Sequence, residues 1–151
     1  MNRRSQIRIA ALLLALVAVR SAAAESRVIE MTGTDALQFS VKRIEAKPGE
    51  SLTIRLTTIS KMAKTEMAHN FVVLASGANA DSFAMAGSMA RKTDYIPEAK
   101  RDQILANSAL AGGGETVEVT FTAPAEPGDY TYLCTFPGHF VAGMKGILAV
   151  Q

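Results

Sequence analysis

Apolar and polar residues alternate in short runs along most of the chain after residue 25. These runs are rich in Thr, Ile and Val and are separated by turn residues such as Pro48-Gly49, and both features are typical of β-strands. About eight short strands at this spacing predict an all-β fold, an antiparallel sandwich or barrel. The expected strands are 27–31, 37–41, 52–58, 71–74, 103–110, 116–122, 130–134 and 146–150.

Residues 81–91 break this pattern and predict one short helix. Asp81 is its candidate N-cap, and Met85 and Met89 have the four-residue spacing of one helix face. Two thioethers at this spacing are suitable ligands for Cu(I). Methionines in such pairs much more often pack in a core, however, and we therefore expect Met85 and Met89 to be core residues.

The first 24 residues predict a cleaved export signal. The basic residues 2–8 precede an apolar run, Ile9 to Val19, and Ala22 and Ala24 supply the small side chains of a cleavage site. A membrane-spanning helix needs about 20 apolar residues, which is more than this run contains. The expected organisation is therefore a signal over 1–24 and a single domain over 25–151, with a soluble periplasmic product and no membrane span after signal removal.

The net charge of +2 for the whole chain does not describe the expected mature domain. Four of the basic residues lie before residue 25, where there is no acidic residue. The remainder has 12 basic and 14 acidic residues, a net charge of −2. A slightly acidic domain with scattered Lys and Arg lacks the basic surface that nucleic-acid binding requires, so we expect no nucleic-acid partner.

Cys134 is the only cysteine, although exported proteins usually carry cysteines in pairs. A lone thiol is buried and inert, paired with another molecule, or held as a thiolate by a metal. His139 and Met144 follow within ten residues, and His69 is the only other histidine. Two imidazoles, one thiolate and a weak axial thioether are the ligand set of a blue copper site, so the combination favours copper.

The segments around these residues resemble azurin, a family of small bacterial blue copper proteins within the cupredoxins. The similarity rests on Met67-Ala-His-Asn-Phe71, Cys134-Thr-Phe-Pro-Gly-His139 and Met144-Lys-Gly146, with further similarity at 33–39, 94–95 and 112–119. It covers essentially the whole expected mature chain. The resemblance implies an eight-stranded Greek-key cupredoxin, built as a sandwich or barrel with a short helical flap.

The resemblance also implies the residues of the metal site. One type 1 copper is expected to bind His69, Cys134 and His139, with Met144 as a weak axial ligand. The backbone carbonyl of Ala68 is the expected contact on the opposite axial side, where azurins have Gly. Two further residues, Asn70 and Thr135, are expected to steady the ligand loop.

Three features depart from azurin. The single Cys134 excludes the azurin disulfide, and Phe71 stands where azurins usually have Trp. Four residues separate His139 from Met144, whereas azurin has three and auracyanin and plastocyanin have four. We therefore expect an azurin-like protein with a ligand loop of auracyanin length.

The family resemblance implies a soluble electron carrier, and not an enzyme, that cycles between Cu(II) and Cu(I). Enzymes of this fold need additional histidines for a second copper centre, and this chain has none left. The expected partners are redox proteins such as periplasmic c-type cytochromes or copper- and haem-containing reductases and oxidases. The alternative is a copper-handling protein that delivers or stores Cu(I), motivated by Met62, Met67, Met85 and Met89.

A partner is expected to dock around His139, because exposed apolar patches mark sites of protein contact. The resemblance to azurin implies that this patch consists of Leu37, Met62, Ala63, Met67, Pro137, Phe140 and Val141. Lys61, Lys64 and Lys145 are expected at its rim, where they would orient an acidic partner at low ionic strength.

Overall fold

The computed structural model describes residues 25–151, so the predicted export signal over 1–24 lies outside the described residues. Within 25–151, no helix combines the length and the apolar character needed to cross a bilayer. The elements, in chain order, are β1 (Arg27–Thr34), β2 (Arg43–Ala46), β3 (Ser51–Ile59), β4 (Ala68–His69), β5 (Val72–Leu74), α1 (Ala80–Ser88), the 3-10 helices η1 (Arg91–Thr93) and η2 (Glu98–Gln103), β6 (Ile104–Asn107), β7 (Ala111–Gly112), β8 (Thr116–Thr122), β9 (Gly128–Leu133) and β10 (Lys145–Val150).

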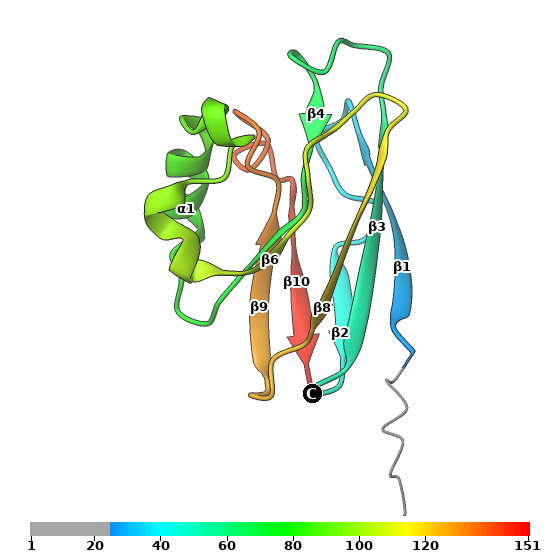
Figure 1. Ribbon diagram of the computed structural model, residues 1–151, viewed down its shortest axis with the longest axis vertical. Coiled ribbons are helices and arrows are strands. Elements are labelled where there is room, and N and C mark those ends of the chain that lie inside the picture. The colour runs from blue at the N-terminus through cyan, green and yellow to red at the C-terminus, as the bar shows by residue number, and fades with distance from the viewer. Residues whose placement is uncertain (1–24) are drawn as a thin grey trace, which may run out of the picture.

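Two large sheets and one small sheet make up the fold (Figure 1). One large sheet has the strand order β1-β3-β8, the other has the order β2-β10-β9-β5-β6, and β4 pairs with β7. The pairs β1–β3 and β2–β10 are parallel and the other pairs are antiparallel. The predicted all-β sandwich is confirmed. The strand count exceeds eight in part because the structure contains β4 and β7. These strands have two residues each and are too short to produce a recognisable alternation of apolar and polar residues.

The main core lies between the two large sheets. Leu52, Ile54 and Leu56 alternate along β3 and each is fully buried. They belong to one cluster with Met31 of β1 and Tyr132 of β9. Burial of one such side chain stabilises a fold by roughly 1.5–3 kcal/mol. The alternation of apolar and polar residues in the sequence thus identifies the β3 side chains that form this core.

A second, smaller cluster attaches α1 to the outer face of the five-stranded sheet, on the side of β9 away from β1 and β3 (Figure 1). Its buried members are Val72, Leu74, Phe83, Ala84, Ile96, Leu133 and Phe140. The helix begins after Asn79, whose Oδ1 accepts a hydrogen bond from the Ser82 N–H at 2.8 Å, so Asn79 and not Asp81 is the N-cap. The helical flap thus packs against the segment that carries Phe140.

The expected core role of Met85 and Met89 is wrong. Their side chains are 71% and 83% exposed, because Phe83, Ala84 and Gly87 occupy the buried face of α1. Spacing of four residues places two side chains on one helix face, but it does not say which face meets the core.

The predicted strand over 37–41 is also absent. Leu37 has a left-handed backbone with φ of 56° and donates its N–H to the Thr34 carbonyl at 2.9 Å, which closes a turn. Phe39 is buried and makes an isolated bridge to Gly33, so the apolar alternation reflects packing without a continuous strand. The strand of this region is β2, four residues that start at Arg43.

Candidate metal centre

The side chains of His69, Cys134 and His139 converge at one end of the sandwich. The two Nδ1 atoms lie 3.2 Å apart, and the Cys134 Sγ lies 3.5 Å from Nδ1 of His139 and 4.0 Å from Nδ1 of His69. Bond lengths of about 2.0 Å to nitrogen and 2.3 Å to sulfur hold the donors of one metal ion roughly 3 to 4 Å apart. The spacing of the three donors therefore fits one metal ion.

Burial keeps both imidazoles unprotonated and available as ligands. The pKa of His69 is lowered to about 4, chiefly by burial, and that of His139 is lowered to about 4 by burial and by the neighbouring His69. Burial also raises the pKa of the Cys134 thiol to about 12, against the effect of nearby backbone N–H groups. A metal cation reverses this last preference, because a coordinated thiol loses its proton.

One hydrogen-bonded loop positions Cys134, His139 and Met144. The Cys134 N–H donates to the Met144 carbonyl at 3.1 Å, which joins the two ends of the loop where β9 stops and β10 begins. The His139 N–H donates to the Phe136 carbonyl at 3.1 Å, and the His139 carbonyl accepts from the Met144 N–H at 2.9 Å. The backbone groups of the loop thus satisfy each other, and the ligand side chains project from a closed frame.

His69 reaches the same point from a different part of the chain. It ends β4, where it pairs with Ala111 of β7, and Ala68 pairs with Gly112. Ala68 and His69 are fully buried. Ala68, whose backbone carbonyl the resemblance implies as an axial contact, is held beside His69 in the buried β4–β7 pair.

Asn70 and Thr135 connect these two parts of the chain. The Thr135 N–H donates to Asn70 Oδ1 at 2.9 Å, and Asn70 Nδ2 donates to Thr135 Oγ1 at 2.8 Å. Each residue directly follows a converging side chain, His69 in one case and Cys134 in the other. The reciprocal pair thereby fastens the ligand loop to β4, at the place where the sequence predicted steadying residues.

The chain matches the model of the copper-binding plastocyanin/azurin family over residues 26–151. This protein belongs to that family. It is 41% identical to auracyanin-A of Chloroflexus aurantiacus over 117 residues, which cover 76% of this chain and 68% of that protein. It is 38% identical to azurin of Bordetella pertussis over 141 residues, which cover 89% of this chain and 92% of that protein.

Solved structures of relatives share the fold. The structure of auracyanin A, described as a blue copper protein of Chloroflexus aurantiacus, matches with a TM-score of 0.73 and 38% identity over 84% of this chain and 100% of that chain. An azurin of Methylomonas sp. strain J matches with a TM-score of 0.72 and 28% identity over 84% of this chain and 99% of that chain. The predicted resemblance is confirmed, and the protein is a copper-binding electron-transfer protein of the cupredoxin family with copper as its cofactor.

The structure separates the residues of the expected docking patch into two groups. Val141 and Met62 are 90% and 45% exposed, Ala63 and Pro137 are also exposed, and Leu37 is half-buried. Met67 and Phe140 are buried at 8% and 7% exposure, and their expected place on an exposed patch is wrong. Phe140 belongs to the cluster beneath α1, because the loop turns it inward and its neighbour Val141 outward.

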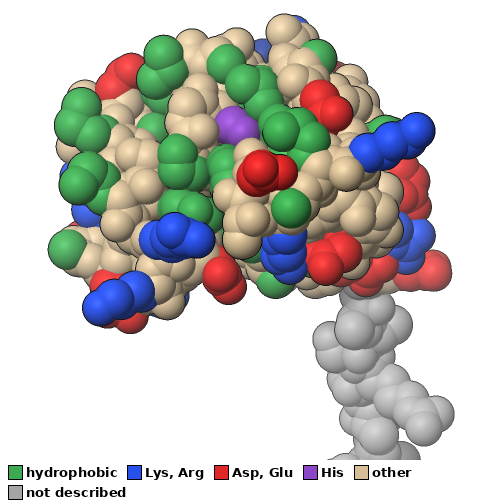
Figure 2. All heavy atoms as spheres, turned by 90° about the horizontal axis from the view of Figure 1, so that it is seen from above, with side chains coloured by type: hydrophobic (Ala, Val, Ile, Leu, Met, Phe, Trp, Pro, Cys, Tyr) green, Lys and Arg blue, Asp and Glu red, His purple; other side chains and the backbone are tan. Residues whose placement is uncertain are grey.

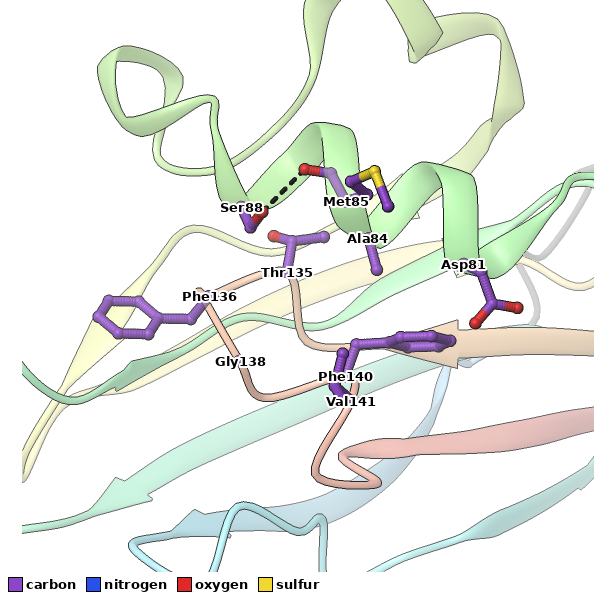
Figure 3. Close-up of a pocket in the computed structure, with 9 residues that line it drawn as sticks. All are labelled: Asp81, Ala84, Met85, Ser88, Thr135, Phe136, Gly138, Phe140 and Val141. Carbon is purple, nitrogen blue, oxygen red and sulfur yellow. Dashed lines mark hydrogen bonds between the residues drawn. The ribbon is translucent and has the colours of Figure 1, made fainter.

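A groove of about 230 Å³ runs between α1 and the ligand loop (Figure 3). Ala84, Met85 and Ser88 reach it from α1, and Gly138, Phe140 and Val141 reach it from the loop. The exposed Met85 side chain is therefore a near neighbour of the ligand loop, which the sequence did not reveal.

Two residues at the centre were not predicted to have a role. The Phe136 ring packs on the His139 ring with centroids 4.8 Å apart, and Gly33 of β1 lies against His69 and Met144. Both residues stand inside segments that resemble azurin, but neither carries a donor atom that signals a site. Only the packing identifies them.

Proposed function

We propose that this protein is a soluble electron carrier that holds one type 1 copper through His69, Cys134 and His139. Met144 is the weak axial ligand in this proposal, and the Ala68 carbonyl is the contact on the opposite side. The observation that carries the proposal is the buried triad of two imidazole nitrogens and one thiol, with the three donor atoms 3.2 to 4.0 Å apart. Copper bound there supplies a one-electron Cu(II)/Cu(I) couple.

The surrounding residues suit a site that changes charge without rearranging. His69, Cys134 and Met144 are fully buried and His139 is 2% exposed, so water is excluded from the donors. The loop hydrogen bonds and the Asn70–Thr135 pair hold the ligand side chains by interactions that do not involve the metal. Such groups beyond the ligands orient them and tune the metal.

His139 is the proposed point of electron exit. Figure 2 shows a histidine side chain at the centre of the upper face, surrounded by hydrophobic side chains. His69 is fully buried, so the exposed histidine edge belongs to His139. A small apolar contact around such an edge suits a transient partner.

The proposed docking patch is formed by Leu37, Met62, Ala63, Pro137 and Val141, without the buried Met67 and Phe140. The proposed partners are redox proteins, such as periplasmic c-type cytochromes or copper- and haem-containing reductases and oxidases. We propose the periplasm as the location, on the strength of the signal pattern over 1–24. The protein itself performs no enzymatic reaction in this proposal.

Val141→Asp is expected to slow electron transfer to a protein partner about tenfold while copper binding stays unchanged. The charged side chain must be desolvated when the patch is covered, at a cost of about 1–2 kcal/mol. Stopped-flow rates with a c-type cytochrome test this. Val28→Asp is the matched control, because Val28 is an exposed valine at the other end of β1 from Gly33. Equal rates for Val141→Asp and Val28→Asp would place the contact elsewhere.

Met144→Leu is expected to keep copper bound and to raise the midpoint potential. Electron donation from the thioether stabilises Cu(II), and leucine cannot supply it. The change nearly conserves side-chain volume at a fully buried position. A tenfold change in the ratio of Cu(II) to Cu(I) affinity corresponds to about 59 mV, which redox titration resolves. Loss of copper would instead make Met144 a primary ligand and contradict the proposed geometry.

The alternative function is Cu(I) delivery or storage, and the observation that favours it is the exposure of the Met85 and Met89 thioethers to solvent. The double change Met85→Leu and Met89→Leu is expected to leave copper content and electron-transfer rate near normal. Because both side chains lie in solvent, the free energy of unfolding should change by less than about 0.5 kcal/mol. Copper content by atomic absorption and Cu(I) competition titration are the measurements. Loss of Cu(I) delivery with unchanged electron transfer would favour copper handling.

A further inference from the structure

Gly33 is the residue of β1 that lies against the metal centre. A Cβ placed on Gly33 would lie 2.6 Å from Cδ2 and 2.9 Å from Cγ of His69, and 2.8 Å from Cε of Met144. Non-bonded carbon atoms pack best at about 3.5–4.0 Å. A methyl group therefore fits at position 33 only if both of these side chains move.

Position 33 requires glycine because a side chain has no room there, and not because the backbone adopts a conformation that only glycine tolerates. Gly33 is absent from the residues with positive φ, and it lies in regular register within β1, opposite Thr58 of β3. Alanine adopts such an extended backbone without strain. A Gly33→Ala change consequently adds a steric contact at the centre and little else.

The contact cannot be relieved by sliding the strands apart. Gly33 pairs with Thr58, and the Thr58 hydroxyl donates to the Ala111 carbonyl at 2.9 Å. Ala111 in turn pairs with His69 in the β4–β7 ladder. Gly33 and His69 thus belong to one hydrogen-bonded frame, and Thr58 within it is fully buried.

We propose that Gly33 is a positioning residue that determines where the His69 imidazole and the Met144 thioether rest at the copper centre. The inference rests on the proposed copper ligation by these two residues. An added methyl group would lie within 3 Å of both side chains, so it displaces the His69 imidazole as well as the Met144 thioether. Weaker donation from either ligand destabilises Cu(II) more than Cu(I), and the midpoint potential rises.

Gly33→Ala tests this in the intact, copper-loaded protein. The expected protein is still blue, with an altered visible and EPR spectrum and a ratio of Cu(II) to Cu(I) affinity about tenfold lower, equal to a rise of about 59 mV. Its affinity for Zn²⁺, which has no redox chemistry, falls as well. Ile54→Ala is the control, since Ile54 pairs with Ile29, four residues before the Gly33–Thr58 pair in both strands, and lies in the core. That variant should lose stability and keep the wild-type spectrum and potential.

A wild-type spectrum, potential and Zn²⁺ affinity in Gly33→Ala would overturn the role of Gly33 and leave the proposed function intact. A wild-type protein that binds copper without turning blue would overturn the proposed function instead. If Gly33→Ala does not fold, the double variant with Met144→Ala removes the Cε that the new methyl meets. Recovery of folding in the double variant supports the proposal. Failure of both variants to fold shows that vacating the Met144 position makes no room for the methyl group, and the proposal that Gly33 positions both ligands is then wrong.

Discussion

Cys134→Ser abolishes the blue colour of the oxidised, copper-loaded protein. The visible absorption of a type 1 centre arises from charge transfer between a thiolate and Cu(II), and a serine hydroxyl offers neither the sulfur nor the negative charge. We expect a complete loss of the visible band, with a far-ultraviolet circular dichroism spectrum like that of the wild type, because serine is close to cysteine in size.

The adjacent substitution Thr135→Ser is the control for Cys134→Ser. It retains the hydroxyl that accepts a hydrogen bond from Asn70 and leaves the sulfur in place, so its colour should persist. Both proteins are loaded with one equivalent of Cu(II) and compared by absorption spectroscopy. Colour that survives Cys134→Ser would exclude Cys134 as the thiolate ligand and remove the basis of the proposed function.

Asn70→Ala destabilises the protein by about 2–4 kcal/mol and disturbs the copper centre. The change leaves the buried Thr135 N–H and hydroxyl without their partners, and each unsatisfied buried group costs about 1–3 kcal/mol. It also frees the ligand loop from β4. Urea denaturation of the metal-free protein measures the first effect, and the visible spectrum of the copper-loaded protein measures the second.

Asn79→Ala is the matched control for Asn70→Ala. Asn79 is the exposed N-cap of α1, and loss of such a cap costs about 1 kcal/mol. The spectrum of this control should be unchanged, because Asn79 contacts no residue of the ligand loop through its cap hydrogen bond. A stability loss in Asn70→Ala no larger than that in Asn79→Ala would show that the Asn70–Thr135 pair does not hold the site together.

Local chemistry in the sequence determined the fold class and the donor set. Strands such as β3 and β9 follow from apolar alternation, since a strand with one face in a core must repeat every two residues. The loop from Cys134 to Met144 carries a thiol, an imidazole and a thioether close together in the sequence, so its capacity to bind a metal is recognisable before the fold is known. His69 was identifiable because the chain has only one histidine outside that loop.

Side-chain direction could not be read from those same patterns. Leu37, Phe39 and Val41 alternate like a strand, yet the left-handed backbone of Leu37 makes a turn. Met85 and Met89 have helical spacing, but Phe83 and Ala84 occupy the face that meets the sheet. The sequence spacing leaves the choice of buried face open, and packing against distant strands makes it.

The sequence by itself thus determined which atoms are available to bind copper and which type of fold carries them. The tertiary structure alone decided how those atoms are held: the Asn70–Thr135 pair, the ring of Phe136 on His139, and the bare backbone of Gly33 against His69 and Met144. The physical reason is that donor chemistry is a property of single residues, whereas close packing depends on segments far apart in the chain that meet only when the strands pair.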